Sequence, residues 1–146
     1  MHKAMISIIP GIQNTSAALD AEQTRLNVIA KNIANANTAH GPDGKPYQRQ
    51  VVVFDTALQQ AMGPDGGVQL APVQVAKIES DNRPALQVFD PGNPDADAKG
   101  MVSMPNINVN EEMADLISAS RSYEANLAAA KNAHTMAMET LSIGKA

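Results

Sequence analysis

Apolar residues recur every seven positions near the start of the chain. Five of them keep this spacing, namely Met5, Ile12, Leu19, Leu26 and Ile33. Such a repeat is typical of a helix whose apolar seam faces another helix. Polar side chains occupy much of the seam's second line, namely Thr15, Ser16, Glu22 and Gln23. Since proline is tolerated in a first turn and costly further in, the pattern predicts a helix from about Pro10 to Asn35 and leaves Met5 to Ile9 open.

A longer pattern runs through the last part of the chain. Its residues step alternately by three and four, namely Met113, Leu116, Ser120, Tyr123, Leu127, Ala130, His134, Ala137 and Leu141. Asn108 can cap this helix with Glu111 three residues later, and Gly144 suits its end. A helix of roughly 33 residues spans about 50 Å, so it needs partners beyond the chain's own middle.

The middle of the chain carries short β-like runs. They lie at Gln50 to Phe54, Val68 to Glu79 and Leu86 to Phe89. Two stretches, Gly41 to Gly44 and Gly63 to Gly67, share a Gly-Pro-Asp-Gly turn chemistry in which Pro presets φ and Gly accepts a positive φ. The runs and turns predict hairpins in a small, partly open sheet.

These zones predict an α+β protein with three parts. Long N- and C-terminal helices are expected to pack as a coiled-coil pair, with a small β-hairpin-rich region between them. The expected divisions are residues 1–38 for the first helix, 39–107 for the β-rich region and 108–146 for the last helix.

Composition narrows the possible functions. The 146 residues include only 3% aromatics and no Trp but 8 Met, which suits helix seams better than a nucleotide platform. The net charge of −4 argues against nucleic acid and anionic membrane as partners. Without Cys, thiolate catalysis and thiolate metal sites are excluded. The apolar stretch at the N-terminus is too short for a Sec-type signal core, so we expect export, if any, without a cleaved signal.

Catalytic and metal chemistry find no support in the sequence. His2, His40 and His134 lack a second ligand at metal-binding spacing, and no nucleophile, P-loop or dinucleotide motif is present. The loop from Asp90 to Gly100 alternates Asp residues but lacks the closing Glu of a calcium loop, so we interpret it as a structural turn. We predict no catalytic residue, no metal and no cofactor.

The segment Asn32 to Thr38 is the most informative heptapeptide. Its three alternating asparagines, Asn32, Asn35 and Asn37, are poor residues for a helix interior. One interpretation is a helix stop followed by a turn, because Asn tolerates the left-handed conformation at a helix end. The other is a corner whose amides lock against a neighbouring helix. The residues alone favour neither.

This heptapeptide resembles the signature of the axial flagellar proteins. Four further blocks resemble those of flagellar basal-body rod proteins of the proximal-rod type, namely Pro42–Tyr47, Asp90–Asp97, Met104–Val109 and Ser118–Asn126. The resemblance extends over nearly the whole chain, and the four blocks in this order are more specific than any one of them.

The resemblance implies a structural subunit of the bacterial flagellar proximal rod. It implies export through the flagellar type III apparatus and polymerisation through concentric terminal helices into a hollow drive shaft that transmits torque across the periplasm. The implied partners are copies of the chain itself, other proximal- and distal-rod proteins, and the membrane-ring base with its adaptor, without nucleic acid or direct membrane insertion.

Assembly contacts are expected on the helix seams and at the asparagine corner. The candidate residues are Ile12, Leu19, Leu26, Ile33, Asn32, Asn35, Asn37, Met113, Leu116, Tyr123, Leu127, His134 and Leu141. Two other classes remain open from the sequence. One is a type III-secreted helical adaptor or chaperone-like binding protein, and the other is an enzyme, which would need a pocket that the sequence does not supply.

Overall fold

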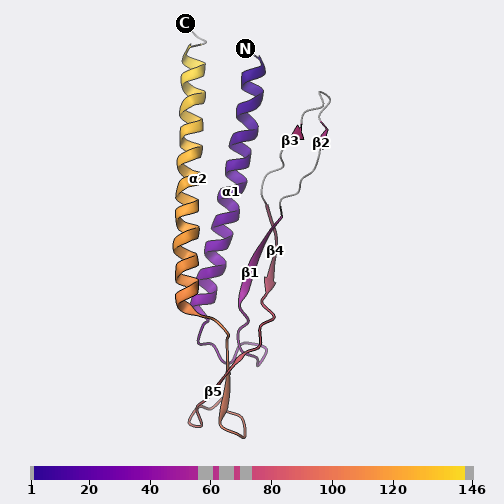
Figure 1. Ribbon diagram of the computed structural model, residues 1–146, viewed down its shortest axis with the longest axis vertical. Coiled ribbons are helices and arrows are strands. Elements are labelled where there is room, and N and C mark those ends of the chain that lie inside the picture. Colours follow the sequence, from indigo (N-terminus) through magenta and orange to yellow (C-terminus); the bar gives the residue numbers. More distant parts are fainter. Residues whose placement is uncertain (1, 56–60, 63–67, 70–73, 144–146) are drawn as a thin grey trace. The chain divides into compact units, whose positions relative to one another are not determined.

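Two long helices stand at the two ends of the sequence in the computed structural model (Figure 1). The structure describes residues 2–55, 61–62, 68–69 and 74–143. Helix α1 spans His2–Ala34 and helix α2 spans Val109–Ile143. The predicted α+β class, with long terminal helices and a small strand-containing middle, is confirmed. The packing of the helices as a coiled-coil pair and the three-part division stay predictions.

Among the residues that the structure describes, six short strands follow α1 and precede α2 in the sequence. They are β1 (Gln50–Asp55), β2 (Ala61–Met62), β3 (Val68–Gln69), β4 (Gln74–Ser80), β5 (Leu86–Phe89) and β6 (Met101–Met104). They form three two-stranded sheets, in which β1 pairs with β4, β2 with β3, and β5 with β6. The predicted run from Val68 to Glu79 is therefore divided between β3 and β4. The predicted turn at 63–67 lies outside the described residues.

The chain divides into two compact units, and each is described by itself. The junction unit comprises Arg25–Val53 and Lys77–Ser118, and the terminal unit comprises Met1–Thr24, Phe54–Ala76 and Ala119–Ala146. The described residues of the junction unit include four buried apolar side chains, namely Val28, Ile29, Ala36 and Val102. In the terminal unit, Ala21 and Ala119 are the buried apolar residues among those described.

Helix α1 begins earlier than predicted. It starts at His2 and continues through Pro10, so the predicted start at Pro10 is too late. Proline lacks one backbone N–H, yet the residues before it keep helical geometry. The helix ends close to the predicted Asn35, where the backbone N–H and the side-chain amide of Asn35 both donate to the Lys31 carbonyl at 3.1 and 2.8 Å. Asn35 thus acts as a C-terminal cap.

Helix α2 has the predicted N-terminal cap. The Asn110 N–H donates to Oδ1 of Asn108 at 3.1 Å, and the Glu112 N–H donates to the Asn108 carbonyl at 3.0 Å. Glu111 reaches back toward the cap but accepts from the side-chain amide of Asn108, at 3.1 Å. The bond from the Asn110 N–H satisfies one of the N–H groups that the first turn of any helix leaves without an internal partner, and the Glu112 N–H makes the first backbone bond of the helix itself.

Strands β5 and β6 form an antiparallel hairpin. Leu86 pairs with Met104, and Phe89 pairs with Met101. Strand β6 was not predicted, because its four residues are too few to show a pattern between Gly100 and Pro105. Gly100 has a φ of 75°, and a Cβ at this position would lie 3.0 Å from Cε2 of Phe89. Only glycine satisfies both conditions without strain.

The loop from Asp90 to Gly100 is held by side chains that replace backbone partners. Oδ1 of Asp97 accepts from the N–H groups of Lys99 and Met101 at 2.8 and 2.9 Å. Oδ1 of Asn93 accepts from the Asp95 N–H at 3.0 Å. This is the geometry expected of a structural turn.

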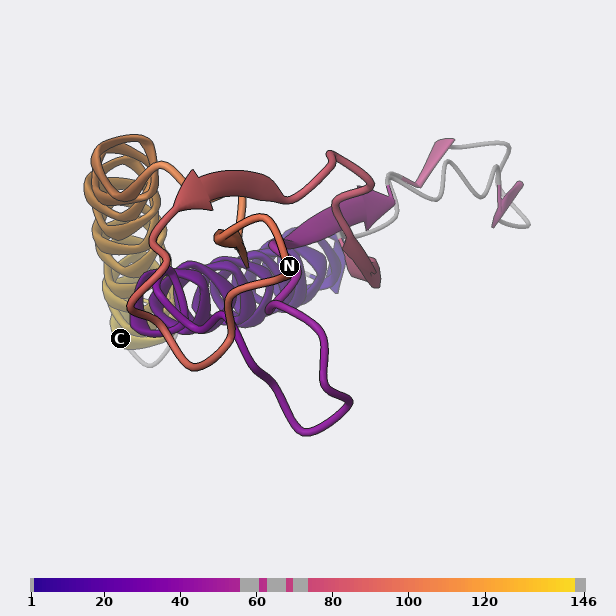
Figure 2. The same ribbon diagram turned by 90° about the horizontal axis from the view of Figure 1, so that it is seen from below.

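The turn from Gly41 to Gly44 is formed as predicted. The Gly44 N–H donates to the Gly41 carbonyl at 3.0 Å, and Gly44 has a φ of 71°. The segment between α1 and β1 that contains this turn is drawn as an open purple loop in Figure 2. Within the described part of the chain, no helix has the length and apolar character that crossing a membrane requires.

Candidate functional site

Asn32 lies near the end of α1 with its side chain fully buried, at 0% exposure. Its Nδ2 donates to the Gln50 carbonyl at 2.9 Å and to Oε2 of Glu112 at 3.0 Å. Its Oδ1 accepts from the Gln50 N–H at 2.9 Å and from the Tyr47 hydroxyl at 3.2 Å. The side-chain amide uses both of its donor hydrogens and accepts twice, which is the full capacity of this group. It therefore joins α1 to the start of β1 and to α2.

Glu112 is the second buried polar residue, at 1% exposure, and it lies in the first turn of α2. Oε1 accepts from Nε of Arg49 at 2.7 Å and lies 2.6 Å from Nη2 of the same residue. Oε2 accepts from Asn32. A buried carboxylate is costly unless it is paired and hydrogen-bonded, and here both oxygens have partners. The positive end of the helix dipole adds to this stabilisation.

Arg49 precedes β1 and connects Glu112 to the end of β4. Its Nη1 lies 3.5 Å from Oδ2 of Asp81, and its Nη2 lies 3.9 Å from Oδ2 of Asp115. Burial alone would lower the pKa of Arg49, but the hydrogen bond and charge of Glu112, followed by the charge of Asp81, raise it above its ordinary value. The guanidinium is therefore held in its charged form.

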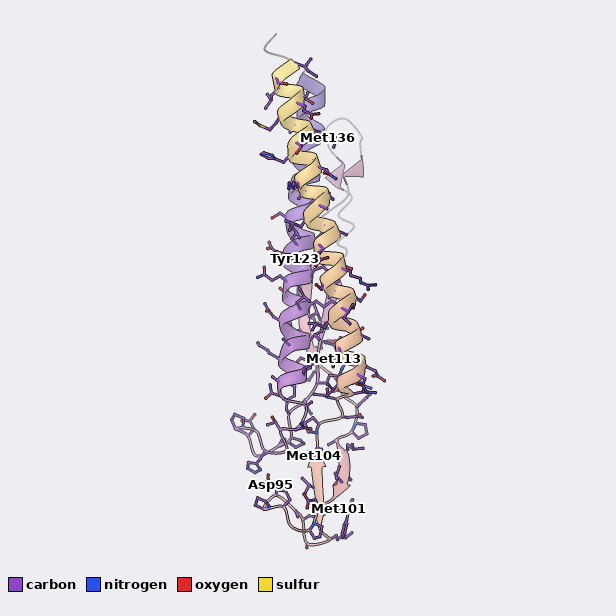
Figure 3. The ribbon with its side chains drawn as sticks, turned by 90° about the vertical axis from the view of Figure 1, so that its left-hand side faces the viewer. Asp95, Met101, Met104, Met113, Tyr123 and Met136 are labelled. Carbon is purple, nitrogen blue, oxygen red and sulfur yellow. The ribbon has the colours of Figure 1, made fainter. Side chains whose placement is uncertain are left out.

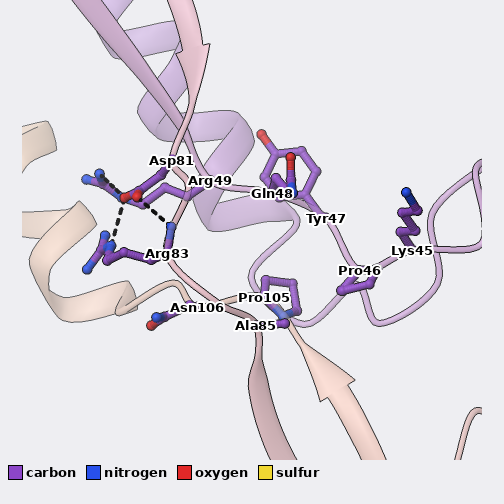
Figure 4. Close-up of a pocket in the computed structure, with 10 residues that line it drawn as sticks. All are labelled: Lys45, Pro46, Tyr47, Gln48, Arg49, Asp81, Arg83, Ala85, Pro105 and Asn106. Carbon is purple, nitrogen blue, oxygen red and sulfur yellow. Dashed lines mark hydrogen bonds and ion pairs between the residues drawn. The ribbon is translucent and has the colours of Figure 1, made fainter.

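Asp81 is in turn bound by Arg83, as the dashed lines in Figure 4 show. The Arg83 N–H donates to Oδ1 of Asp81 at 3.1 Å, and Nε of Arg83 donates to Oδ2 at 2.8 Å. The backbone and side-chain hydrogen bonds from Arg83, and then the charges of Arg83 and Arg49, lower the pKa of Asp81. We call the set Asn32, Tyr47, Arg49, Gln50, Asp81 and Glu112 the polar junction.

Tyr47 completes the polar junction on the side of the long α1–β1 loop. Burial of its hydroxyl, followed by the charge of Glu112, raises its pKa above the ordinary value near 10. The phenol is therefore neutral at physiological pH and can donate to Asn32.

A shallow pocket of about 120 Å³ lies beside the polar junction (Figure 4). Its walls include Pro46, Tyr47, Arg83, Pro105 and Asn106. The charged groups that line it are largely paired with one another, and Arg83 is held by Asp81. Among the residues that the structure describes, no three His, Cys, Asp or Glu side chains are grouped to hold a metal ion. The hydrogen bonds and ion pairs of the polar junction connect α1, the start of β1, the end of β4 and the first turn of α2.

The structure distributes the predicted residues of α1 between several environments. Asn32 lies in the polar junction, Asn35 caps the helix and Asn37 is exposed. Asn35 ends the helix through its amide and not through a left-handed conformation, because no described residue other than glycine has a positive φ. Asn32 bonds a residue of the other helix, as the second interpretation expects. Leu19, Leu26 and Ile33 are half-buried, and the side chain of Ile12 lies outside the described ones.

The predicted residues of α2 fall on two adjacent lines of the helix. Leu116 and Tyr123 belong to a less exposed line with steps of four and three, namely Glu112, Leu116, Ala119, Tyr123, Asn126, Ala130, Ala133 and Ala137. Met113, Leu127, His134 and Leu141 are exposed, and Leu127 is 51% exposed. Figure 3 labels Met113 and Tyr123 on this helix, together with exposed Met136. In the single chain, one line of α2 is therefore partly buried, and the adjacent line with Met113, Leu127 and Leu141 stays exposed.

Sequence reasoning missed most of the polar junction. No pattern in the sequence identifies Arg49, Gln50, Asp81 or Glu112 as members of a site. Arg49 and Glu112 are 63 positions apart, so no local spacing connects them. The sequence signals were Asn32, in the heptapeptide, and Tyr47, which lies in one of the blocks that resemble rod proteins.

Comparison with known proteins places these elements in a family. A family model described as "Flagella basal body rod protein" matches residues 12–39, which contain Asn32. A second, "Flagellar basal body rod FlgEFG protein C-terminal", matches residues 98–143, which contain Glu112. The flagellar basal-body rod protein FlgC of Yersinia enterocolitica is 46% identical over 129 residues, covering 88% of this chain and 92% of the relative. The chain belongs to the FlgC family of flagellar basal-body rod proteins.

More distant relatives extend the similarity along the chain. FlgC of Borreliella burgdorferi is 39% identical over 150 residues and covers 94% of this chain and 98% of its own length. FlgC of Bacillus subtilis is 36% identical and covers 90% of this chain and 94% of its own length. The resemblance that the sequence blocks indicated is confirmed, and the rod protein is a structural subunit of the flagellar basal body.

Proposed function

We propose that this rod protein forms part of the proximal rod and polymerises through its two terminal helices. In this proposal, concentric helices form the wall of a hollow drive shaft that transmits torque across the periplasm. The observation that carries the proposal is the open apolar line of α2 in a chain of the FlgC family. Three large apolar residues of this line in the terminal unit are at least half exposed, namely Leu127, Met138 and Leu141. Exposed Met136 and Ile143 lie on the opposite side of the helix, at 3.6 residues per turn.

An exposed apolar line on a long helix is stabilised when neighbouring helices cover it. Single exposed apolar residues are ordinary on protein surfaces, but a contiguous line marks an interaction site. Copies of the same chain and other proximal- and distal-rod proteins would supply such helices. Order in the terminal helices would then increase with assembly, because binding stabilises the folded state.

The remaining partners follow from the same proposal. The subunit would be exported by the flagellar type III apparatus, and it would meet the membrane-ring base and its adaptor. It would act without catalysis, cofactor, nucleic acid or membrane insertion. A secreted adaptor, by comparison, would function without entering the rod.

Leu127→Asp tests the assembly face. Because Leu127 is 51% exposed in the single chain, the substitution should change the free energy of unfolding of the free subunit by less than about 1 kcal/mol. In the rod it would bury an unpaired charge at a cost of several kcal/mol. We expect loss of motility, and absence of the variant from purified basal bodies, when it replaces the wild-type chain in a strain that lacks its own FlgC.

Asn132→Asp is the matched control for Leu127→Asp. It adds the same charge at an exposed polar position of α2. We expect normal incorporation and motility from this variant. Normal motility from Leu127→Asp would contradict the proposed interface.

A further inference from the structure

We propose that the polar junction is a register lock, which sets how α1 and α2 align along their lengths before the subunit enters the rod. The inference rests on the proposed assembly through the terminal helices. It assigns to Asn32, Arg49 and Glu112 a positioning role that is separate from the apolar assembly contacts.

The apolar seams alone specify the alignment weakly. The α1 seam repeats every seven residues from Met5 to Ile33, so a partner helix that slides by one heptad meets an equivalent set of apolar side chains. The less exposed line of α2 contains mainly alanine beyond Tyr123. Small, similar side chains give little energetic difference between one alignment and the next.

The polar junction removes this equivalence. The bond from Asn32 to Glu112 joins the two helices directly at 3.0 Å. A shift of one heptad would bring Ala119 to the place of Glu112, since Ala119 follows it by seven positions. Asn32 would then lose an acceptor, and Arg49 would lose its main carboxylate partner. A single buried polar contact is known to specify register between helices in this way.

Two further contacts tie the aligned helices to the rest of the junction unit. The amide of Asn32 binds both the N–H and the carbonyl of Gln50, so α1 cannot slide relative to the start of β1 without breaking two hydrogen bonds. The Asn108 cap determines where α2 begins. The lock therefore relates both helices to one strand, and all of its bonds lie within a single chain.

A distance measurement on the free, full-length subunit tests the lock. The chain has no Cys, so Lys31→Cys and Ser118→Cys place two nitroxide labels uniquely, at exposed positions of α1 and α2 in the junction unit. Pulsed electron paramagnetic resonance should give one narrow distance distribution. A broad distribution in this parent would overturn the inference, whatever any further variant shows.

The second arm replaces the buried ion pair by apolar residues of similar size, in the double variant R49M/E112L. Such replacements are often neutral or stabilising for the fold, so helix content by circular dichroism should be kept. The distance distribution should broaden by roughly twofold or split into two populations, and incorporation into rods should fall by roughly tenfold. If the ion pair only stabilises the fold, R49M/E112L should lose helix content as well as incorporation into rods. If the ion pair sets the register, the variant should keep its helix content and lose incorporation.

The matched control is K77Q/E79Q. It removes one exposed ion pair of the same unit and leaves the net charge unchanged, so the distance distribution should stay narrow. If the distance distribution of R49M/E112L is as narrow as that of the parent, the register lock is wrong, whether or not the variant enters the rod. A parent with a narrow distribution that never enters a rod would instead refute the proposed function and leave the lock standing.

Discussion

The two units of the rod protein differ in what holds them together. The junction unit contains both buried polar residues, Asn32 and Glu112, as well as the cap of α2. The terminal unit has buried alanines and a line of exposed large apolar residues. The hydrogen bonds of the junction unit are all made within one chain. The exposed apolar side chains of the terminal unit can be buried by any neighbouring helix with a complementary apolar face. The difference suggests that one unit specifies alignment and the other drives association.

The largest expected effect is a loss of stability when the buried ion pair of the junction unit is broken. Arg49→Met leaves Glu112 buried at 1% exposure without its cation, and removing one partner of a buried pair costs about 3–5 kcal/mol. We expect the free energy of unfolding of the free subunit, measured in urea, to fall by this amount. In R49M/E112L much of the loss should be recovered, since the unpaired carboxylate is gone. Equal losses in both variants would show that the unpaired Glu112 carboxylate is not the source of the loss.

The next effect concerns the amide of Asn32. Asn32→Leu fills a similar volume but leaves the N–H and the carbonyl of Gln50 without their partner, and an unsatisfied buried group costs about 1–3 kcal/mol. We expect a loss of about 2–3 kcal/mol in thermal or urea unfolding. Asn37→Leu is the control, because Asn37 is exposed in the same heptapeptide and should stay within about 0.5 kcal/mol of the parent. Equal losses in both variants would show that the buried hydrogen bonds of Asn32 contribute no more to stability than an exposed side chain does.

How much of this comparison was predictable depends on the distance between the residues involved. The two helices, the Asn108 cap and β5 follow from periodicity and local chemistry, which act over a few residues. The polar junction does not, because Asn32, Arg49 and Glu112 come from three separate segments. For Asn32 the sequence leaves two roles open, and only the contacts with Gln50 and Glu112 decide between them.

The α2 seam shows a different limit. Residues spaced alternately by three and four lie along one line of a helix. The adjacent line has the same spacing and is offset by a single residue, so periodicity alone does not distinguish the two lines. The sequence could therefore name Leu116 and Leu127 together, although the single chain half-buries the first and exposes the second. Which line a chain covers itself depends on tertiary packing, and periodicity does not contain that information.

A smaller effect lies in the β5–β6 hairpin, away from the polar junction. Gly100→Ala would place a Cβ 3.0 Å from Cε2 of Phe89 at a φ of 75°, so we expect a loss of about 1–2 kcal/mol. Gly92→Ala is the control, since its nearest contact, to Oδ1 of Asp90, would be an ordinary 3.7 Å. It should be neutral or slightly stabilising. Near-equal melting temperatures would show that the hairpin adapts to the added methyl group.

The smallest effect is a pH dependence at the edge of the polar junction. The pKa of Asp81 is lowered by the hydrogen bonds from Arg83 and by the nearby charges, so its ionised form is favoured in the folded state. A lowered pKa contributes stability that is complete above the unfolded value near 3.9 and is lost as the pH falls through the folded value. Because the Arg83 side chain is 48% exposed, screening should keep the contribution below about 1 kcal/mol.

The parent should exceed Asp81→Asn in free energy of unfolding at pH 7, and the difference should decline as the pH is lowered from about 4. A difference that stays constant through this range would mean that the charge of Asp81 contributes nothing, and that its hydrogen bonds alone connect β4 to the junction.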